Sequence, residues 1–168
     1  MTETPPARTL VLGVGNAWRS DDGAGVAVAE RLRPHAGRFD VLVQSGEGTS
    51  LMAAWEGASS VIVIDAARSG SAPGTVHRLD AAVDRIPSDF LHYSTHAFGV
   101  AEAIEMARAL GTLPERLILY GIEGMRFEAG TGLTPPIADA VERVVEEIVA
   151  QVDVGASRPA PSDPVSST

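Results

Sequence analysis

Two adjacent carboxylates, Asp21 and Asp22, follow a glycine turn in the segment LVLGVGNAWRSDDGAG, residues 10–25. A single aspartate at the start of a helix commonly caps it. A neighbouring pair of carboxylates repels itself unless a proton or a cation compensates, so the second acid is also a candidate metal ligand or proton acceptor. The residue types alone leave capping and chemistry open for this pair.

The same turn lacks the features of a phosphate-binding loop. Trp18 stands where the third glycine of a GxGxxG fingerprint belongs, and no GK[ST] sequence follows. Acidic side chains at the N-terminus of a helix also repel an anionic ligand. We therefore expect no nucleotide at this position.

A third carboxylate and a histidine occur at comparable places further along the chain. The apolar run SVIVID predicts a central strand that ends on Asp65, and His96 lies in a loop that leads into a predicted helix. Sites in open α/β sheets form at the carboxyl ends of strands, so Asp22, Asp65 and His96 are expected to meet. Two carboxylates and a neutral imidazole suit a borderline divalent ion, held weakly and with open coordination positions.

Each of these residues also has a purely structural interpretation. Asp65 could cap the turn that follows it, and His96 could be a first-turn residue that contacts solvent. His92 competes with His96 for any ligand role, whereas His35 and His77 lie in less favourable segments.

The elements that must position these residues alternate between strands and helices. Short β-favouring runs predict strands over residues 10–14, 39–44, 60–65, 75–80 and 116–122, of which 75–80 is a weak strand at an edge. Apolar periodicity predicts helices over residues 22–33, 51–55, from about 95 to 110, and 135–152. This alternation predicts an α/β sandwich around a mainly parallel sheet.

Helix boundaries are expected from capping residues. Thr49 or Ser50 is expected to cap the second helix, Ser94 or Thr95 the third, and Thr134 the last. Pro34 is expected to stop the first helix and Gly111 to end the third, in which Val100, Ile104, Ala107 and Leu110 are expected to share the buried face.

Composition limits the classes of function. The chain has 168 residues, which suits one domain, expected over residues 1–152, with a disordered tail over residues 153–168. Its net charge of −9 disfavours nucleic acid and anionic membranes as partners, and the lack of cysteine excludes thiolate chemistry. Neither a signal peptide nor an apolar run long enough to span a membrane is visible, so we expect a cytoplasmic protein.

Several of these segments together resemble the hydrogenase maturation proteases. The segments are GVGN, DDGAG, VIVIDA, STHAFGVAEAI and GTGLTPPIADAV, and the resemblance covers roughly residues 10–152. Gly124, in GIEG, stands where many members carry proline, which bears on the shape of that loop. The resemblance implies an endopeptidase of the aspartic type that removes the C-terminal extension of the nickel–iron hydrogenase large-subunit precursor.

The same resemblance implies a fold and a site. The fold is a three-layer α/β/α sandwich of the phosphorylase/hydrolase-like type, with a five-stranded, mostly parallel twisted sheet and one antiparallel strand, for which residues 75–80 are the candidate. The metal-contacting and catalytic positions correspond to Asp22, Asp65 and His96. The metal is nickel carried by the precursor, so cleavage acts as a checkpoint for loading; in the isolated protein the site is open to other divalent ions.

Several details stay open at this point. With no cysteine available, the expected nucleophile is a water molecule activated by the metal or by Asp21, Asp22 or Asp65 as base. The expected partner is the large-subunit precursor, and a monomer is the expected state. Further residues are candidates for lining the peptide-binding cleft: Gly13, Gly15, Asn16, Asp21, Gly46, Gly48 and Thr49.

Two other classes of function compete with the peptidase. A docking or maturation factor without catalytic activity would use the same ligands. A small-molecule hydrolase or nucleotide-binding enzyme fits less well because the phosphate loop is missing.

Overall fold

The computed structural model describes residues 8–35, 37–91 and 97–156, in which five strands form one sheet. The strands are β1 (Thr9–Val14), β2 (Phe39–Gln44), β3 (Ser60–Ala67), β4 (Val76–Asp80) and β5 (Arg116–Glu123). Their order in the sheet is β2-β1-β3-β5-β4, with β4 antiparallel to β5 and the other neighbours parallel. The expected edge strand is therefore confirmed, and so is its antiparallel direction.

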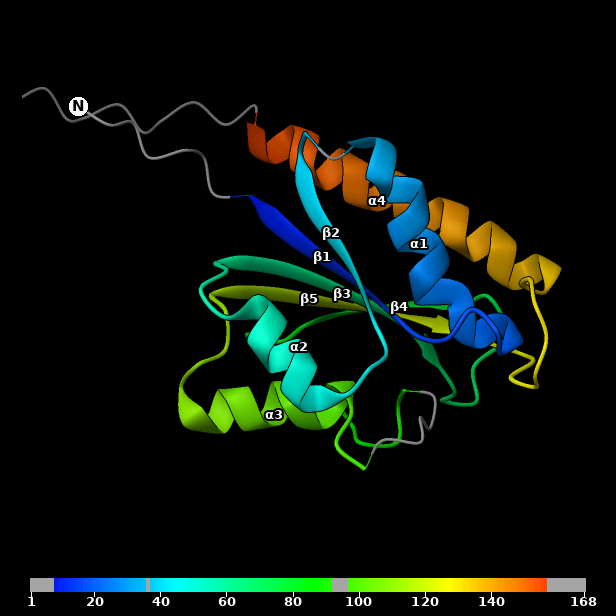
Figure 1. The fold of residues 1–168 in the computed structure, drawn as a ribbon, viewed down its shortest axis with the longest axis horizontal. Helices are drawn as coiled ribbons and strands as arrows, with labels where there is room; N and C mark the ends of the chain where they lie inside the picture. Colours follow the sequence, from blue (N-terminus) through cyan, green and yellow to red (C-terminus); the bar gives the residue numbers. More distant parts are fainter. Residues whose placement is uncertain (1–7, 36, 92–96, 157–168) are drawn as a thin grey trace, which may run out of the picture.

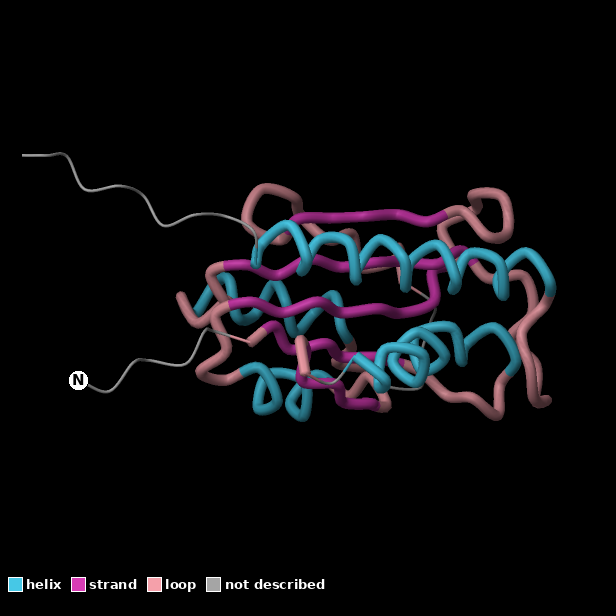
Figure 2. The backbone as a smooth tube through the Cα atoms, turned by 90° about the horizontal axis from the view of Figure 1, so that it is seen from above, coloured by secondary structure: helices cyan, strands magenta, loops and turns pink. Residues whose placement is uncertain are grey.

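Helices cover both faces of the sheet. The α-helices are α1 (Ala24–Leu32), α2 (Gly48–Trp55), α3 (Val100–Leu110) and α4 (Pro135–Ala156), and the 3-10 helices are η1 (Ser20–Gly23) and η2 (Arg33–His35). Figure 1 shows α1 and α4 on one face and α2 and α3 on the other. In Figure 2, α4 runs along the strands. The three-layer sandwich is confirmed. None of the helices in the described residues is both long and apolar enough to cross a membrane.

The alternation of side chains along β3 separates two cores. Val61 and Val63 belong to the cluster under α2 and α3, whereas Ile62 and Ile64 belong to the cluster under α1 and α4. Successive side chains of a strand point to opposite faces, so Asp65 follows Val61 and Val63 toward α2 and α3. The strand was expected to end on Asp65 but continues to Ala67, so the sheet places this carboxylate near the end of a strand that is buried from Val61 onward.

Close approach between α1 and the sheet depends on two glycines. A Cβ at Gly25 would lie 2.2 Å from the Ile64 carbonyl oxygen and 2.4 Å from that of Val14, and a Cβ at Gly13 would lie 2.4 Å from the Gly25 carbonyl oxygen. Gly13 therefore contacts α1, which gives it a packing role in place of the expected position in the cleft.

The cap predictions for the second and third helices are wrong. Glu47, not Thr49 or Ser50, precedes α2, and its carboxylate accepts hydrogen bonds from both of their backbone N–H groups, each at 2.9 Å. Helix α3 begins at Val100 with Gly99 as its cap, whereas Ser94 and Thr95 lie outside the described residues.

The expected ends of the other helices are only partly correct. The segment expected to start the first helix at Asp22 forms η1 before α1 begins, and Pro34 lies within η2 after α1 has ended. The predicted buried face of α3 is also wrong at one residue, because Leu110 is 63% exposed. Helix α4 continues to Ala156, into the predicted tail, and residues 157–168 lie outside the described part of the chain.

The capping contact of Glu47 predicts a pH dependence. The backbone N–H groups of Thr49 and Ser50 lower the pKa of Glu47 from 4.5 to about 2. Because the folded pKa is depressed, the stabilisation is complete above pH 4.5 and is lost as the pH falls toward 2. Urea unfolding of wild type and Glu47→Gln between these pH values should show a difference in stability that shrinks on acidification. A difference that does not change with pH would contradict this role of the charge.

Candidate functional site

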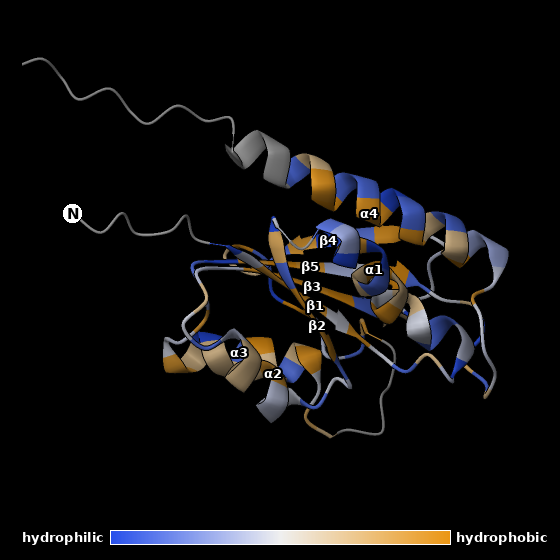
Figure 3. Cartoon of the chain, turned by 45° about the horizontal axis from the view of Figure 1, so that its top comes forward, coloured by the Kyte–Doolittle hydropathy of each residue, from blue (hydrophilic) through white to orange (hydrophobic). Residues whose placement is uncertain are grey.

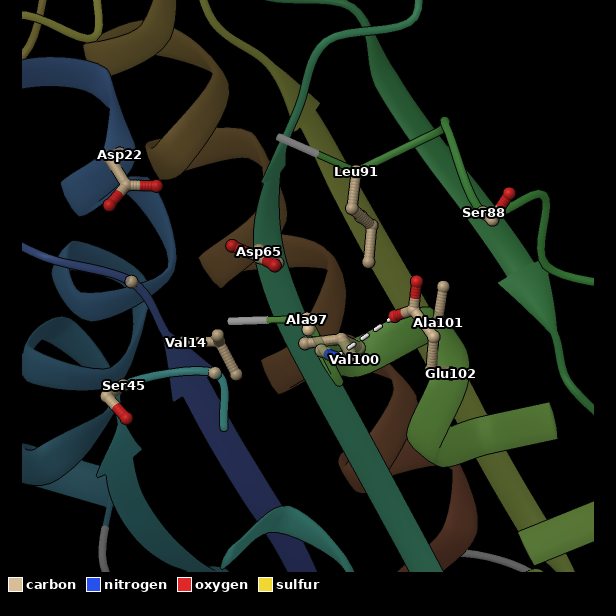
Figure 4. A pocket seen from close by; sticks show the side chains of 13 residues that line it. Val14, Asp22, Ser45, Asp65, Ser88, Leu91, Ala97, Val100, Ala101 and Glu102 are labelled. Carbon is tan, nitrogen blue, oxygen red and sulfur yellow. Dashed lines mark hydrogen bonds between the residues drawn. The ribbon is translucent and has the colours of Figure 1, made fainter. Parts of the chain in front are cut away.

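A pocket with a volume of about 90 Å³ lies at the carboxyl ends of β1 and β3. The chain passes from β1 to β2 on one side, and β3 lies on the other side of β1, so this is the point where strand order reverses. Asp22 and Asp65 both line the pocket, together with the end of β1, the loop after β2 and the start of α3 (Figure 4). The structure therefore brings together the two predicted carboxylates.

Asp65 is held on β3 with little contact to water. It is 7% exposed, and its Oδ1 accepts a hydrogen bond from the Ala66 N–H at 2.8 Å. Burial raises the pKa of Asp65 well above its ordinary value, and the neighbouring charge of Asp22 raises it further. A carboxylate in this position favours a proton or a cation as a partner.

Asp22 reaches the pocket from the turn after β1. Its Oδ2 accepts a hydrogen bond from the Asn16 N–H at 3.1 Å, and the Asn16 side-chain oxygen in turn accepts from the Trp18 N–H at 2.9 Å. No side-chain hydrogen bond caps η1 or α1 among the described residues. The capping interpretation of Asp22 is therefore wrong, and its carboxylate faces the pocket.

The structure places Asp21 away from the pocket. Asp21 is fully buried, and its carboxylate accepts hydrogen bonds from the N–H groups of Met125, Arg126 and Thr134 at 2.8 to 2.9 Å. The Thr134 hydroxyl, which was expected to cap α4, also donates to Asp21. Asp21 thus fixes the loop after β5, and the structure corrects its expected roles as a base and as a cleft residue.

His96 lies outside the described residues. Ala97, the residue that follows it, lines the pocket together with Gly99. Within residues 8–35, 37–91 and 97–156 no group of three or more His, Asp or Glu side chains could hold a metal. Among the described residues, Asp22 and Asp65 alone are thus too few to form such a group.

A third carboxylate at the pocket, that of Glu102, has a structural role at the start of α3. Glu102 lines the pocket, and its Oε2 accepts the N–H of the cap residue Gly99 at 3.1 Å. This bond fixes the N-terminus of α3 beside the pocket (Figure 4).

The remaining cleft candidates divide into two groups. Gly15 and Gly46 line the pocket, and both have positive φ angles. Gly48 instead lies against the Phe98 ring, and the backbone N–H of Thr49 donates to Glu47 at the start of α2.

A second polar cluster, which sequence reasoning missed, lies at the end of β5. The buried carboxylate of Glu123 accepts from the Ser69 backbone N–H at 2.9 Å and from its hydroxyl, and the Nε2 of His77 lies 3.3 Å from Glu123. The same Nε2 is the ring nitrogen near the Ser69 hydroxyl, at 3.5 Å. A serine–histidine–acid triad needs both ring nitrogens, so this cluster does not have the geometry of an activated serine. In the sequence, the feature that could have indicated this cluster is Glu123, a carboxylate at the end of the apolar run RLILYGIE.

The fold and the pocket define an α/β protein with a pair of carboxylates at the switch point of a mostly parallel sheet. The HycI family, described as hydrogenase maturation protease, matches residues 26–151. This chain belongs to the hydrogenase maturation protease family, and it is accordingly a peptidase.

Individual relatives match most of the chain. The hydrogenase expression/formation protein HupD of Rhodobacter capsulatus is 32% identical over 154 residues, which cover 88% of this chain and 72% of HupD. The hydrogenase 2 maturation protease of Escherichia coli is 30% identical over 148 residues, which cover 85% of this chain and 89% of that protein.

Solved structures agree with the fold. The hydrogenase maturating endopeptidase HybD from E. coli superposes with a TM-score of 0.71 at 28% identity, covering 88% of this chain and 93% of HybD. The expected sheet with one antiparallel strand is thus shared with a protein of the same family.

Proposed function

We propose that this chain removes the C-terminal extension of a nickel–iron hydrogenase large-subunit precursor after nickel has been inserted. The observation that carries the proposal is the Asp22–Asp65 pair at the switch point of the sheet. Membership of the hydrogenase maturation protease family supports the class of substrate.

Nickel bound to the precursor would act as part of the substrate. The charged form of Asp65 is disfavoured by burial and by Asp22, so an approaching divalent cation relieves a repulsion that a nickel-free precursor leaves in place. A loaded precursor therefore binds better than an unloaded one, which is the differential affinity that a checkpoint requires. Two carboxylate oxygens suit such an ion, with His96 proposed as the nitrogen ligand.

Peptide hydrolysis at this site follows the aspartic type in our proposal. A carboxylate of the Asp22–Asp65 pair takes a proton from water, and the water oxygen adds to the scissile carbonyl carbon. The C–N bond then breaks as the proton passes to the leaving amine. Asp65 is the buried member of the pair and is held on strand β3, so we assign it this transfer.

Location and assembly are proposals as well. We infer a monomer that acts in the cytoplasm on an unassembled large subunit. The net charge of −9 supports solubility and disfavours self-association at neutral pH. Light scattering after size exclusion should give a mass close to the 17.5 kDa of one chain.

The proposed function predicts nickel-dependent cleavage. Purified protein is incubated with nickel-loaded and nickel-free precursor of a large subunit from the same organism, and intact mass is measured. We expect loss of a C-terminal fragment from the loaded precursor alone. Binding without any cleavage would indicate a docking factor, and cleavage of both precursors would remove nickel from the recognition step.

A further inference from the structure

Within the described part of the chain, the edge of the sheet at β2 is open. β2 is the last strand in the order β2-β1-β3-β5-β4, and in the described residues it pairs with β1 alone (Figure 3). An open edge presents a row of backbone N–H and C=O groups that another extended chain can pair with.

The hydrogen bonds to β1 show which residues face outward. The Gln44 carbonyl oxygen accepts from the Gly15 N–H at 3.1 Å, so Gln44 faces β1. Backbone groups of a strand alternate in direction, which turns those of Val41 and Val43 away from β1. At the start of the strand, the Arg8 guanidinium donates to the Phe39 carbonyl oxygen at 3.0 Å. The open part of the edge is therefore its second half, at Val41 and Val43.

Among the residues that the structure describes, none gives this half of the edge the usual protection against pairing. Proteins protect edges with lysine, proline or inward charges, but the strand reads FDVLVQ, and its one charged residue, Asp40, forms an ion pair with Arg8 at 3.1 Å. Leu42 and Val43 are 44% and 39% exposed on opposite faces of the strand. Such an edge favours an added strand whose side chains cover both residues.

The open edge leads directly to the carboxylate pocket. Ser45 and Gly46, which follow β2, line that pocket together with Asp22 and Asp65. The pocket volume of about 90 Å³ is far below the roughly 300 Å³ of a small ligand site, so it can take little of a peptide beyond the scissile bond. The remainder of a bound peptide must lie on the surface outside.

From these observations we propose that the free edge of β2 binds the precursor's C-terminal extension as an added β-strand. The inference rests on the proposed function, since it names where that substrate lies. The extension pairs with the backbone of Val41 and Val43, and its side chains pack against Leu42 and Val43. Pairing holds the chain extended, so the scissile bond is presented at Asp22 and Asp65 as the strand passes Ser45.

The substitution Val43→Pro tests this proposal by placing a proline at the free edge of β2. Val43→Pro removes an outward N–H and adds a ring that obstructs pairing, while the bonds from Leu42 and Gln44 to β1 remain. We expect KM for the loaded precursor to rise about tenfold or more, with kcat within about twofold. Val43→Thr keeps the branched shape and the N–H but loses part of the apolar contact, so it is the matched control for the backbone pairing, and its KM should rise much less than that of Val43→Pro. Unfolding curves establish that both variants are folded.

A second measurement does not depend on the folding of a variant. Two synthetic peptides of the extension are N-methylated at alternate residues, in opposite frames, and used as competitors of cleavage by the wild-type protein. Strand pairing uses alternate residues, so one peptide should inhibit about tenfold better than the other. Equal inhibition by the two frames would overturn the proposal.

Other outcomes separate this inference from the proposed function. If wild type cleaves the precursor and Val43→Pro does so with unchanged KM, the strand pairing is wrong and the proposed function stands. If wild type is a dimer that Val43→Pro dissociates, the edge binds a second copy of this chain and the proposal fails. If wild type does not cleave the loaded precursor, the proposed function itself fails, and the strand pairing that rests on it falls with it.

Discussion

Replacing Asp65 by asparagine is expected to abolish cleavage of the nickel-loaded precursor while making the protein more stable at neutral pH. The side chain keeps its shape and can still accept the Ala66 N–H, but it loses its charge and its basicity. Loss of a positioned base costs about 10² to 10⁴ in rate, and loss of an anionic contact to the substrate metal adds to this. We therefore expect cleavage to fall by about a thousandfold or more.

The gain in stability follows from the raised pKa of Asp65. The folded protein binds this proton more tightly than the unfolded chain does, so the stability contributed by the carboxyl group is complete at low pH. That stability is lost as the pH rises from the ordinary value of 3.8 through the folded pKa. Asparagine has no charge to bury, so Asp65→Asn should exceed wild type by about 1–3 kcal/mol at pH 7 and match it at low pH.

Chemical unfolding over this pH range and a cleavage assay check the two effects together. Asp22→Asn is the matched control, because Asp22 is more exposed and asparagine can still accept the Asn16 N–H. It should lose cleavage to a similar extent, with a smaller gain in stability than Asp65→Asn because it removes only the repulsion between the two charges and leaves Asp65 buried. Full cleavage by Asp65→Asn would exclude Asp65 from the chemistry, and a large loss of stability would make it a structural residue.

Much of the fold could be predicted because the strands are short apolar runs with clear ends. The second strand was predicted with its observed bounds, Phe39–Gln44, and the weak run at residues 75–80 is indeed the antiparallel edge strand. The starts of helices were harder. Glu47 is not a usual cap type, yet its longer side chain reaches two N–H groups at once, which residue preferences alone do not show.

The site could be predicted only in part, because the two adjacent acids have different partners. Nothing local to the DDG sequence distinguishes Asp21 from Asp22. The difference lies in groups 104 to 113 residues away, since Met125, Arg126 and Thr134 surround Asp21 alone. The two neighbouring carboxylates therefore have different surroundings, with Asp22 at the pocket. The role of each acid depends on tertiary contacts that a sequence does not display.

Replacing Asp21 by alanine is expected to destabilise the protein by about 3–5 kcal/mol, the largest effect on stability that we predict. The substitution leaves three partly buried N–H groups, those of Met125, Arg126 and Thr134, without their acceptor. Asparagine in place of Asp21 restores only part of the stability that alanine loses. Both carboxylate oxygens accept N–H groups, so either orientation of the amide places a donor against a donor. We expect Asp21→Asn to lose about 2 kcal/mol.

Thr134 provides the matched control for Asp21. Thr134→Val removes the hydroxyl that donates to Asp21 but leaves the backbone N–H, so about 1 kcal/mol should be lost, whereas Thr134→Ser should be close to wild type. Urea unfolding measures the stability of each of these variants.

In cleavage assays at a temperature where it is folded, Asp21→Asn should retain its rate within a few fold, because Asp21 does not line the pocket. A folded and fully stable Asp21→Asn without activity would instead return this residue to the chemistry. Neighbouring acids with opposite phenotypes, one losing stability and the other losing cleavage, would show that a single turn serves both the fold and the site.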